Sequence, residues 1–245
     1  MSADRILFVS DLHLDGAAPQ AISQFESFLD QQARGAAALY ILGDLFESWV
    51  GDDDDEPARS GVCAALRRHV AGGHACFVMR GNRDFLLGTG FEARTGCRLL
   101  PDPLLLEWGS ARAFVSHGDP LCTADHSYQQ FRSMVRDPAW QQHYLALPLS
   151  TRRALAEAAR SGSRAHTTRT HDVIMDVEPG AVAAAFRTAD VSLMIHGHTH
   201  RPAIHSLEVD GSPRTRIVLG DWYDQGSVLW LDREGRFELQ SLARS

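Results

Sequence analysis

Short apolar runs alternate with amphipathic stretches along the first eighty residues of the chain. The runs RILFVS (5–10), AALYIL (37–42) and ACFVM (75–79) have the length and composition of buried strands. Between them, AISQFESFLDQQA (21–33) and SGVCAALRRHVA (60–71) repeat their apolar residues at the spacing of a helix face. Strands that alternate with helices in this way predict βαβ units around a buried parallel sheet.

The rest of the chain is richer in strand patterns. A short helix is predicted near 88–95, and turns are predicted at the Asp-Gly pair 210–211 and the Glu-Gly pair 234–235. The strand candidates are LLLEW (104–108), RAFVS (112–116), VSLMI (191–195), AIHSLEV (203–209), RIVLG (216–220) and GSVLWL (226–231). This strand-rich ending predicts mixed sheets, so we expect the α/β (α+β) class.

The segment 121–175 has a different pattern. YQQFRSMVR, PAWQQHYLALPL and STRRALAEAARS follow one another as helical stretches with no strand between them. They predict a helical insertion within a single domain spanning residues 1–245. Residues 151–170 hold five Arg and one acid, Glu157, which fits either a solvated helix face or contact with anionic lipid headgroups. The acidic run 52–55 is interpreted as a solvated loop.

Composition narrows the class of protein. The 245 residues are 44% hydrophobic with a net charge of −7, so the chain can bury a core but lacks the basic balance of a general nucleic-acid binder. Its four Cys form no C-x-x-C pair, which argues against thiolate-bound zinc. No apolar run approaches the ~20 residues of a membrane span, and the N-terminus lacks the pattern of a signal peptide. We therefore expect a cytoplasmic location.

Polar clusters follow five of the predicted strands. These clusters are Asp11-Leu-His13, Gly43-Asp44, Gly81-Asn82, His117-Gly118 and Gly197-His198-Thr199-His200. Ligands of open α/β sheets bind at the carboxyl ends of strands, so five separate strands are predicted to bring these side chains to one crevice. A lone D-x-H is a weak signal, and His117 alone would be an ordinary structural histidine. All five clusters together predict a metal site.

The residue types suit a pair of metal ions. Carboxylate, imidazole and amide oxygen without thiolate suit Mn²⁺, Fe or Zn²⁺. Asp44 has two oxygens and can bridge two ions. Two ions ~4 Å apart activate a water and clamp a phosphoryl oxygen.

The series D-L-H, G-D, G-N, H-G and G-H-T-H resembles the calcineurin-like metallophosphoesterase superfamily over residues 11–200. The resemblance implies a sandwich of two mixed β-sheets flanked by helices, with a dinuclear metal centre. It assigns one ion to Asp11, His13, Asp44 and His200. It assigns the other to Asp44, Asn82, His117 and His198.

Arg83 departs from the superfamily pattern, in which most members carry His at this position. Arginine cannot donate a proton near neutral pH, but its planar fork is suited to phosphate. This exchange favours a leaving group that needs no proton, such as a phosphate, and so predicts cleavage of a pyrophosphate. The alternative for Arg83 is an ion pair with a nearby acid such as Asp84.

Longer blocks carry a closer resemblance. SDLHLD, YILGDLFESWVGDD, GNRDFLLG, HGDPLCTAD, IMDV and HGHTHRP are similar to the UDP-2,3-diacylglucosamine pyrophosphohydrolases of lipid A synthesis. The resemblance implies that metal-activated water attacks the α-phosphorus, giving UMP and 2,3-diacylglucosamine 1-phosphate. It also implies two Mn²⁺ per chain and a peripheral position on the cytoplasmic face of the inner membrane. A monomer with a lipid-linked nucleotide substrate and no nucleic-acid partner is expected.

The family's functional residues carry over one by one. Catalytic roles fall on Asn82, Arg83 and His198. Substrate contacts fall on Asn82, Arg83, Asp125, Ser163, Thr167 and His198, and a last contact falls on Thr170, where the family usually has a long or basic side chain. Arg169 is the neighbouring candidate for that contact.

The resemblance also implies that the helical insertion is a lid that holds the acyl chains. The apolar lid residues that could line such a chamber are Phe131, Met134, Val135, Trp140, Tyr144, Leu145, Leu147 and Leu149. Two alternatives remain at this point. One is a superfamily enzyme acting on a soluble nucleotide diphosphate or phosphodiester, and the other is a non-catalytic protein-binding scaffold.

Overall fold

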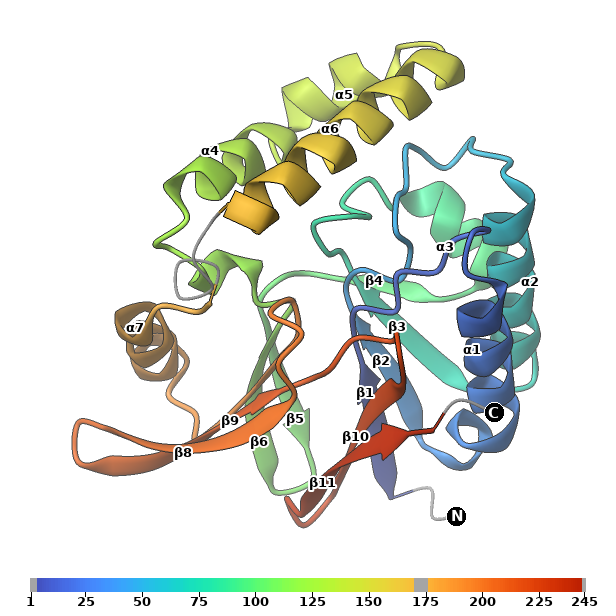
Figure 1. Ribbon diagram of the computed structural model, residues 1–245. Coiled ribbons are helices and arrows are strands. Elements are labelled where there is room, and N and C mark those ends of the chain that lie inside the picture. The colour runs from blue at the N-terminus through green and yellow to red at the C-terminus, as the bar shows by residue number, and fades with distance from the viewer. Residues whose placement is uncertain (1–3, 170–175, 244–245) are drawn as a thin grey trace.

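The computed structural model describes residues 4–169 and 176–243, and the side chains of residues 162–169 lie outside that description. Two β-sheets pack face to face, with helices on their outer sides (Figure 1). A layer of apolar side chains fills the space between the sheets, and a second cluster lies between the first sheet and its helices. The predicted sandwich of two mixed sheets flanked by helices is confirmed.

The first sheet has the strand order β11-β10-β1-β2-β3-β4. Its strands are β1 (Arg5–Val9), β2 (Ala38–Leu42), β3 (Ala75–Met79), β4 (Arg98–Leu100), β10 (Gly226–Asp232) and β11 (Phe237–Leu242). Strands β1 to β4 are parallel and are joined by α1 (Pro19–Gln31), α2 (Pro57–Ala71) and α3 (Thr89–Thr95). The predicted βαβ units are therefore present. The three-residue β4 and the half-exposed β11 were not predicted.

The second sheet has the order β5-β6-β7-β9-β8. Its strands are β5 (Leu104–Trp108), β6 (Ala111–Ser116), β7 (Leu193–His196), β8 (Ala203–Val209) and β9 (Ser212–Val218). Helix α7 (Pro179–Ala189) covers its outer face (Figure 1). The sequence did not predict α7, because this alanine-rich segment buries only Val182 and Phe186, a single pair at i and i+4.

Three consecutive helices lie in the segment 121–175, and we call them the lid helices, or the lid. They are α4 (His126–Val135), α5 (Pro138–Leu145) and α6 (Leu149–Arg169), and they lie together beyond one end of both sheets (Figure 1). The side chain of Asp137 accepts a hydrogen bond from the Trp140 N–H, and Pro138 occupies the first helical position of α5. The cap and the proline explain why α4 ends and α5 begins as a separate helix. None of the helices in the described part of the chain is both long and apolar enough to span a membrane.

The interpretation of residues 52–55 as a solvated loop holds for part of the segment: it is a loop in which Asp53 and Asp55 are exposed, but Asp54 is buried. The Asp54 carboxylate has no exposed surface and forms ion pairs with Arg59 and with Arg153 of α6. Asp53 pairs with Arg152, the neighbouring arginine of the lid. Arg160 pairs with Glu157 and lies 3.9 Å from Asp15. Much of the positive charge of the lid is therefore matched by acids of this chain.

His69 on α2 predicts a loss of stability in acid. The residue is 5% exposed and stacks on His74, with ring centroids 4.9 Å apart. Burial, with a smaller contribution from His74, lowers the pKa of His69 from 6.5 to about 4. Since the unfolded chain takes up this proton first, folding stability falls as the pH drops from about 6.5 to about 4.

We expect His69→Leu to gain stability over the wild type in that pH window and to show a smaller difference above it. Urea unfolding near pH 7.5 and near pH 5 measures both differences. His143→Leu, at an exposed position on α5, is the control and should follow the wild type at each pH. Equal differences at both pH values would contradict the buried, neutral state of His69.

Candidate metal centre

The five polar clusters lie at the carboxyl ends of five strands drawn from both sheets. Asp11, Asp44 and Asn82 follow β1, β2 and β3 of the first sheet, whereas His117 and His198 follow β6 and β7 of the second. All seven predicted metal ligands are thereby brought to the junction of the two sheets. The sequence predicted the strand ends, but it did not show that the crevice lies between two sheets.

The backbone at this junction is unusual for side-chain-bearing residues. Asp11, His13, Asp44, His198 and His200 have φ angles between 49° and 70°, in the left-handed region. Such conformations cost free energy in residues other than glycine and cluster at functional sites. Five of the predicted ligands therefore have a backbone conformation that their residue types do not favour. Such a concentration of strained residues is typical of a functional site.

Two glycines permit the close approach of the ligand loops. A Cβ atom at Gly81 would lie 2.0 Å from Oδ1 of Asp44, and one at Gly197 would lie 2.3 Å from Oδ2 of Asp11. Neither position can hold a side chain without moving a predicted ligand. The glycines of the G-N and G-H-T-H motifs are therefore needed because a side chain at either position would displace a predicted ligand.

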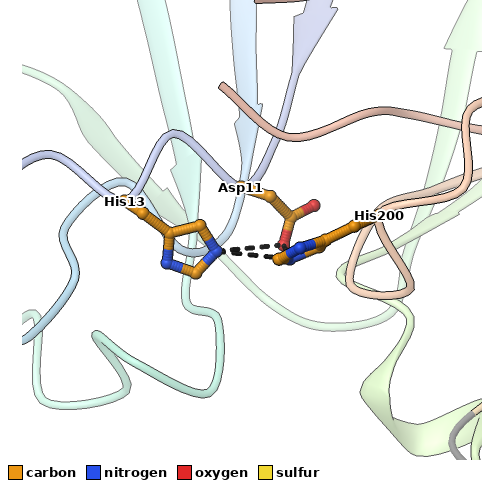
Figure 2. A group of neighbouring side chains, drawn as sticks. All are labelled: Asp11, His13 and His200. Carbon is orange, nitrogen blue, oxygen red and sulfur yellow. Dashed lines mark hydrogen bonds and ion pairs between the residues drawn. The ribbon is translucent and has the colours of Figure 1, made fainter. Parts of the chain in front are cut away.

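A first group joins Asp11, His13 and His200. Figure 2 shows these three side chains pointing toward one another. Oδ1 of Asp11 is 3.3 Å from Nε2 of His200 and 3.9 Å from Nε2 of His13, and the two Nε2 atoms are 3.3 Å apart. The other Asp11 oxygen accepts a hydrogen bond from the His198 backbone N–H. Oδ1 is thus left facing the imidazoles.

Two outer carboxylates orient these imidazoles. Oε2 of Glu47 is 3.0 Å from Nδ1 of His13, and Oδ2 of Asp221 is 3.4 Å from Nδ1 of His200. The Glu47 contact is an ion-pair contact and not a regular hydrogen bond. Carboxylates at Nδ1 favour the hydrogen on that atom and leave the Nε2 lone pairs facing inward. The sequence analysis did not identify Glu47 or Asp221.

A second group joins Asn82, His117 and His198. Nδ1 of His117 donates a hydrogen bond to the Leu42 carbonyl at 2.8 Å, and its Nε2 lies 2.9 Å from Oδ1 of Asn82. Nδ1 of His198 is also 2.9 Å from that amide oxygen. Three potential ligand atoms therefore meet at one point.

Asp44 lies between the two groups. Its Oδ2 is 3.8 Å from Nε2 of His13, and its Oδ1 is 3.7 Å from Nε2 of His117. The carboxylate faces one histidine of each group with a different oxygen, which is the arrangement that a bridging ligand requires.

The electrostatics of the junction favour positive charge. Burial alone would raise the pKa of Asp11, but His200, His117 and His13 outweigh it and hold that pKa well below its usual range. Burial alone would lower the pKa of His117, but Asp44, Asp119 and Asp11 raise it to about 9. Carboxylates that stabilise positive charge on their neighbours provide what a cation site needs.

The donor set fits two metal ions. Inward lone pairs of His13 and His200 lie 3.3 Å apart, and Oδ1 of Asp11 has no hydrogen-bond partner among the described residues. Such converging acceptors repel one another unless a cation lies between them. Ligand atoms of Asp11, His13 and His200, and of Asp11, Asp44 and His117, each fall within 4.8 Å of one another. The first group together with Asp44 could hold one ion, and the second group with Asp44 the other.

Asp84 holds the ligand loops together. Its carboxylate has no exposed surface and accepts N–H groups of Gly81, Asp44 and Leu45 at 2.8, 3.3 and 2.8 Å. The alternative for Arg83, an ion pair with Asp84, is not present, because this carboxylate is occupied by backbone groups. The Arg83 guanidinium instead borders a cavity.

A cavity of about 440 Å³ lies between the lid and the body beside the second group. Asn82 and Arg83 border it, with Glu47 next to them. The remaining wall is mostly aromatic and aliphatic and includes Trp49, Phe85, Leu86, Phe131, Trp140, Tyr144, Leu155, Ala156 and Ala159. A pocket of this size and lining is suited to an apolar ligand with one polar end.

Only part of the predicted lid lining borders this cavity. Phe131, Trp140 and Tyr144 do, while Val135 is buried elsewhere and Leu147 packs on the main core. Met134 and Leu145 are exposed. Leu155, Ala156 and Ala159 of α6 were not predicted to line the cavity, although their spacing of one and three residues could have identified them as one helix face.

The structure describes only some of the residues that were predicted to contact the substrate. Asp125 caps α4, where its side chain accepts the Tyr128 N–H and the Ser127 hydroxyl, and it does not border the cavity. Ser163 and Thr167 lie on α6, but their side chains are outside the described part of the structure. Thr170 lies outside the described residues, as does the side chain of Arg169.

Removal of the Glu47 charge should weaken metal binding. We expect Glu47→Gln to lower the affinity of the site roughly tenfold to a hundredfold, because the outer carboxylate fixes the orientation of His13. Titration of the metal-free protein with Mn²⁺, followed by calorimetry, gives the dissociation constants. Glu92→Gln, whose carboxylate accepts the Leu99 N–H and contacts none of the predicted ligands, is the matched control. An unchanged affinity in Glu47→Gln would remove its orienting role.

The fold and this junction agree with the comparison with known proteins. The profile of the calcineurin-like phosphoesterases matches residues 4–202. The chain belongs to the calcineurin-like phosphoesterase family.

Close relatives share a single name. A Stenotrophomonas maltophilia (strain K279a) protein named UDP-2,3-diacylglucosamine hydrolase is 49% identical over 245 residues, which cover 97% of this chain and 98% of the relative. A Xanthomonas oryzae pv. oryzae (strain PXO99A) protein with the same name is 48% identical over 236 residues, covering 94% and 96%. Among solved structures, a novel archaeal phosphodiesterase is 15% identical with a TM-score of 0.49, covering 97% of this chain and 99% of the other.

Proposed function

We propose that this protein hydrolyses the pyrophosphate bond of UDP-2,3-diacylglucosamine, giving UMP and 2,3-diacylglucosamine 1-phosphate. The observation that carries the proposal is the apolar cavity bordered by Asn82 and Arg83, because it joins a lipid-sized pocket to the phosphoesterase centre. Relatives that are 48–49% identical over nearly the whole chain are named for this substrate.

The chemistry is a water-driven cleavage of a phosphoanhydride. Water attacks the α-phosphorus, the bond to the bridging oxygen breaks, and the lipid sugar phosphate departs with the bonding electrons. Two ions bound by the predicted ligands supply activation of the water and neutralise charge on the phosphoryl oxygens. We propose Mn²⁺ for these ions, since the donors are carboxylate, imidazole and amide oxygen.

The residues of the chain position the substrate. Arg83 places a permanent positive charge on the cavity border with Asn82 and Glu47, where charge would build on the phosphoryl group. Its effect reaches Glu47, whose pKa would be raised by burial but is lowered by His13 and Arg83. A phosphate leaving group needs no proton, so a fixed charge serves at this position better than an acid. Asn82 and His198 complete the proposed phosphoryl contacts.

The lid holds the acyl chains in this proposal. Trp49, Phe85 and Trp140 offer aromatic surface, while Leu155, Ala156 and Ala159 provide the opposing helix face. Contact with such a wall contributes about 25 cal/mol for each Å² of apolar surface removed from water. A soluble nucleotide would leave this wall in contact with water, which is why a phosphoesterase acting on soluble nucleotides is the weaker alternative.

We also propose a monomer that docks on the cytoplasmic face of the inner membrane through its lid. Of the seven large apolar side chains that stand out as exposed in the described chain, four belong to the lid helices: Phe131, Met134, Leu145 and Leu155. Because Arg152, Arg153 and Arg160 are engaged by acids of the chain, apolar contact is favoured over attraction to anionic headgroups.

Replacing Met134 with Glu should then lower partitioning onto phospholipid vesicles roughly tenfold, with little dependence on salt. Sedimentation with vesicles at low and high ionic strength measures both quantities. Ile204→Glu, at a 50% exposed position on β8, is the control and should bind as the wild type does. Binding that disappears at high salt would instead support an electrostatic contact.

The reaction itself is tested by incubating the protein with UDP-2,3-diacylglucosamine and Mn²⁺ in detergent micelles, in parallel with His13→Ala. Release of UMP and the lipid sugar phosphate by the wild type, and its loss in the variant, is the expected result. Two bound ions and cleavage of an aryl phosphodiester, without turnover of the lipid nucleotide, would retain the phosphoesterase and discard the lipid substrate. A protein that binds no metal and cleaves neither substrate would support the scaffold alternative.

A further inference from the structure

The acidic run 52–55 connects the body of the protein with the lid beside the cavity. On the body side, Asp52 accepts hydrogen bonds from the Gly88 and Gly90 N–H groups at the start of α3, at 3.1 and 2.8 Å. It also accepts the indole N–H of Trp49, which borders the cavity, at 3.1 Å. A Cβ atom added at Gly88 or at Gly90 would lie 2.6 Å from an atom of Asp52, so the backbone at both glycines packs directly against this side chain.

On the lid side, Asp53 receives Arg152 near the start of α6. Both terminal nitrogens of Arg152 bind the two oxygens of Asp53. The same guanidinium donates to the Val50 carbonyl at 2.6 Å and to the Leu147 carbonyl at 3.0 Å. Arg152 is only 2% exposed, so this charge is buried and depends on its partners.

Asp54 forms a second connection between the body and the lid. Asp54 has no exposed surface and binds Arg59 of α2 with one oxygen and Arg153 of α6 with the other. Two neighbouring aspartates therefore bind two neighbouring arginines across 99 residues of sequence. These pairs connect the lid to the body beside the cavity.

Arg152 lies on the helix face that forms the cavity wall. Leu155, Ala156 and Ala159 follow it at i+3, i+4 and i+7, which places all four on one face of α6. The carbonyl of Arg152 accepts the hydroxyl of Tyr144, another wall residue, at 2.8 Å. A displacement of Arg152 would therefore move two parts of the apolar wall.

We propose that Asp53 and Arg152 are positioning residues that set the width of the acyl-chain cavity and thereby the affinity for the lipid half of the substrate. The inference rests on the proposed function, since it takes this cavity to be the acyl-chain site. Neither residue belongs to the two groups of predicted metal ligands. Their loss should therefore weaken substrate binding and leave the rate of the chemical step nearly unchanged.

The test compares two variants with one control. Asp53→Asn removes a charge from a side chain that is 61% exposed and is expected to fold. Arg152→Met removes the buried guanidinium while keeping most of its length. Asp210→Asn is the control, because Asp210 forms the same two-pronged pair with Arg187 on the far side of the second sheet.

KM and kcat are measured for diacyl nucleotides with long and short chains and for an aryl phosphodiester. We expect both variants to raise the KM of the long-chain substrate roughly tenfold, with kcat and aryl phosphodiester cleavage within about twofold of the wild type. Asp210→Asn should leave all three values unchanged. A parallel loss on every substrate, or an unchanged chain-length preference, would overturn the positioning role.

Hydrogen–deuterium exchange separates this inference from the proposed function. Faster exchange over residues 138–161 in Asp53→Asn, but not in Asp210→Asn, supports the connection whatever the substrate is. Equal exchange in the two variants overturns it. If the wild type does not cleave the diacyl nucleotide at all, the proposed function fails, and the exchange measurement still decides whether these pairs position the lid.

Discussion

An Asp44→Asn variant is expected to lose roughly a thousandfold in turnover of UDP-2,3-diacylglucosamine. Asparagine has nearly the size of aspartate and can still accept the Arg83 backbone N–H, which Asp44 accepts at 2.8 Å. It lacks the second oxygen and the negative charge, however, and both are needed at a position that faces His13 and His117 at once. The loss should therefore come from the metal groups and not from the fold.

Metal content and secondary structure distinguish a loss of bound ions from a loss of the fold. Elemental analysis of Asp44→Asn should show fewer bound ions than the wild type, while its far-ultraviolet circular dichroism remains that of the wild type. Asp221→Asn is a graded comparison, because it alters an outer carboxylate at 3.4 Å from His200 and should cost less. Full metal content with full turnover in Asp44→Asn would contradict its place between the two ions.

The second large effect is expected at Arg83. Arg83→Ala should lower kcat/KM for the lipid nucleotide roughly a hundredfold, since it removes a preorganised positive charge from the developing phosphoryl charge. Arg83→Lys keeps the charge but loses the planar fork, so it should recover only part of the activity. Cleavage of an aryl phosphodiester, whose leaving group differs, should fall less than cleavage of the pyrophosphate.

Arg83→His provides the opposite comparison. Histidine can donate a proton, so this variant should shift the preference toward an alkyl phosphodiester relative to the pyrophosphate. The ratio of kcat/KM values for the two substrates is the measurement, because it cancels general losses of activity. A wild-type protein that prefers the alkyl ester, or a ratio unchanged by Arg83→His, would contradict the leaving-group argument.

The ligand clusters could be predicted because each is a local signal. A run such as RILFVS ends abruptly in Asp11 and His13, and the change from apolar to polar lies within a few residues of sequence. The parallel strands then carry these ends to the same edge. The close approach at Gly81 and Gly197 was not predicted, because it depends on Asp44 and Asp11 from other strand ends.

The missed features depend on partners far away in the sequence. The residues 52–55 look solvated when considered alone, and their pairing with the lid depends on Arg152 and Arg153, which lie 99 residues after Asp53 and Asp54. Glu47 and Asp221 contact different histidines of the first group, yet neither belongs to a recurring local pattern. Strand β4 has three residues and β11 exposes one face, so their pairing with longer strands and not their own sequence defines them.

The ligand groups also draw on both halves of the sandwich. Asp11 and His13 follow the first sheet while His200 follows the second, and Asn82 faces His117 and His198 across the same junction. Each bound ion would therefore act as a cross-link between two layers that otherwise meet through apolar side chains. Ligand binding to the folded state alone stabilises it in proportion to the logarithm of ligand concentration. Metal supply would thus govern not only catalysis but also how firmly the two sheets are held in register, and starvation for the ion would loosen the whole sandwich.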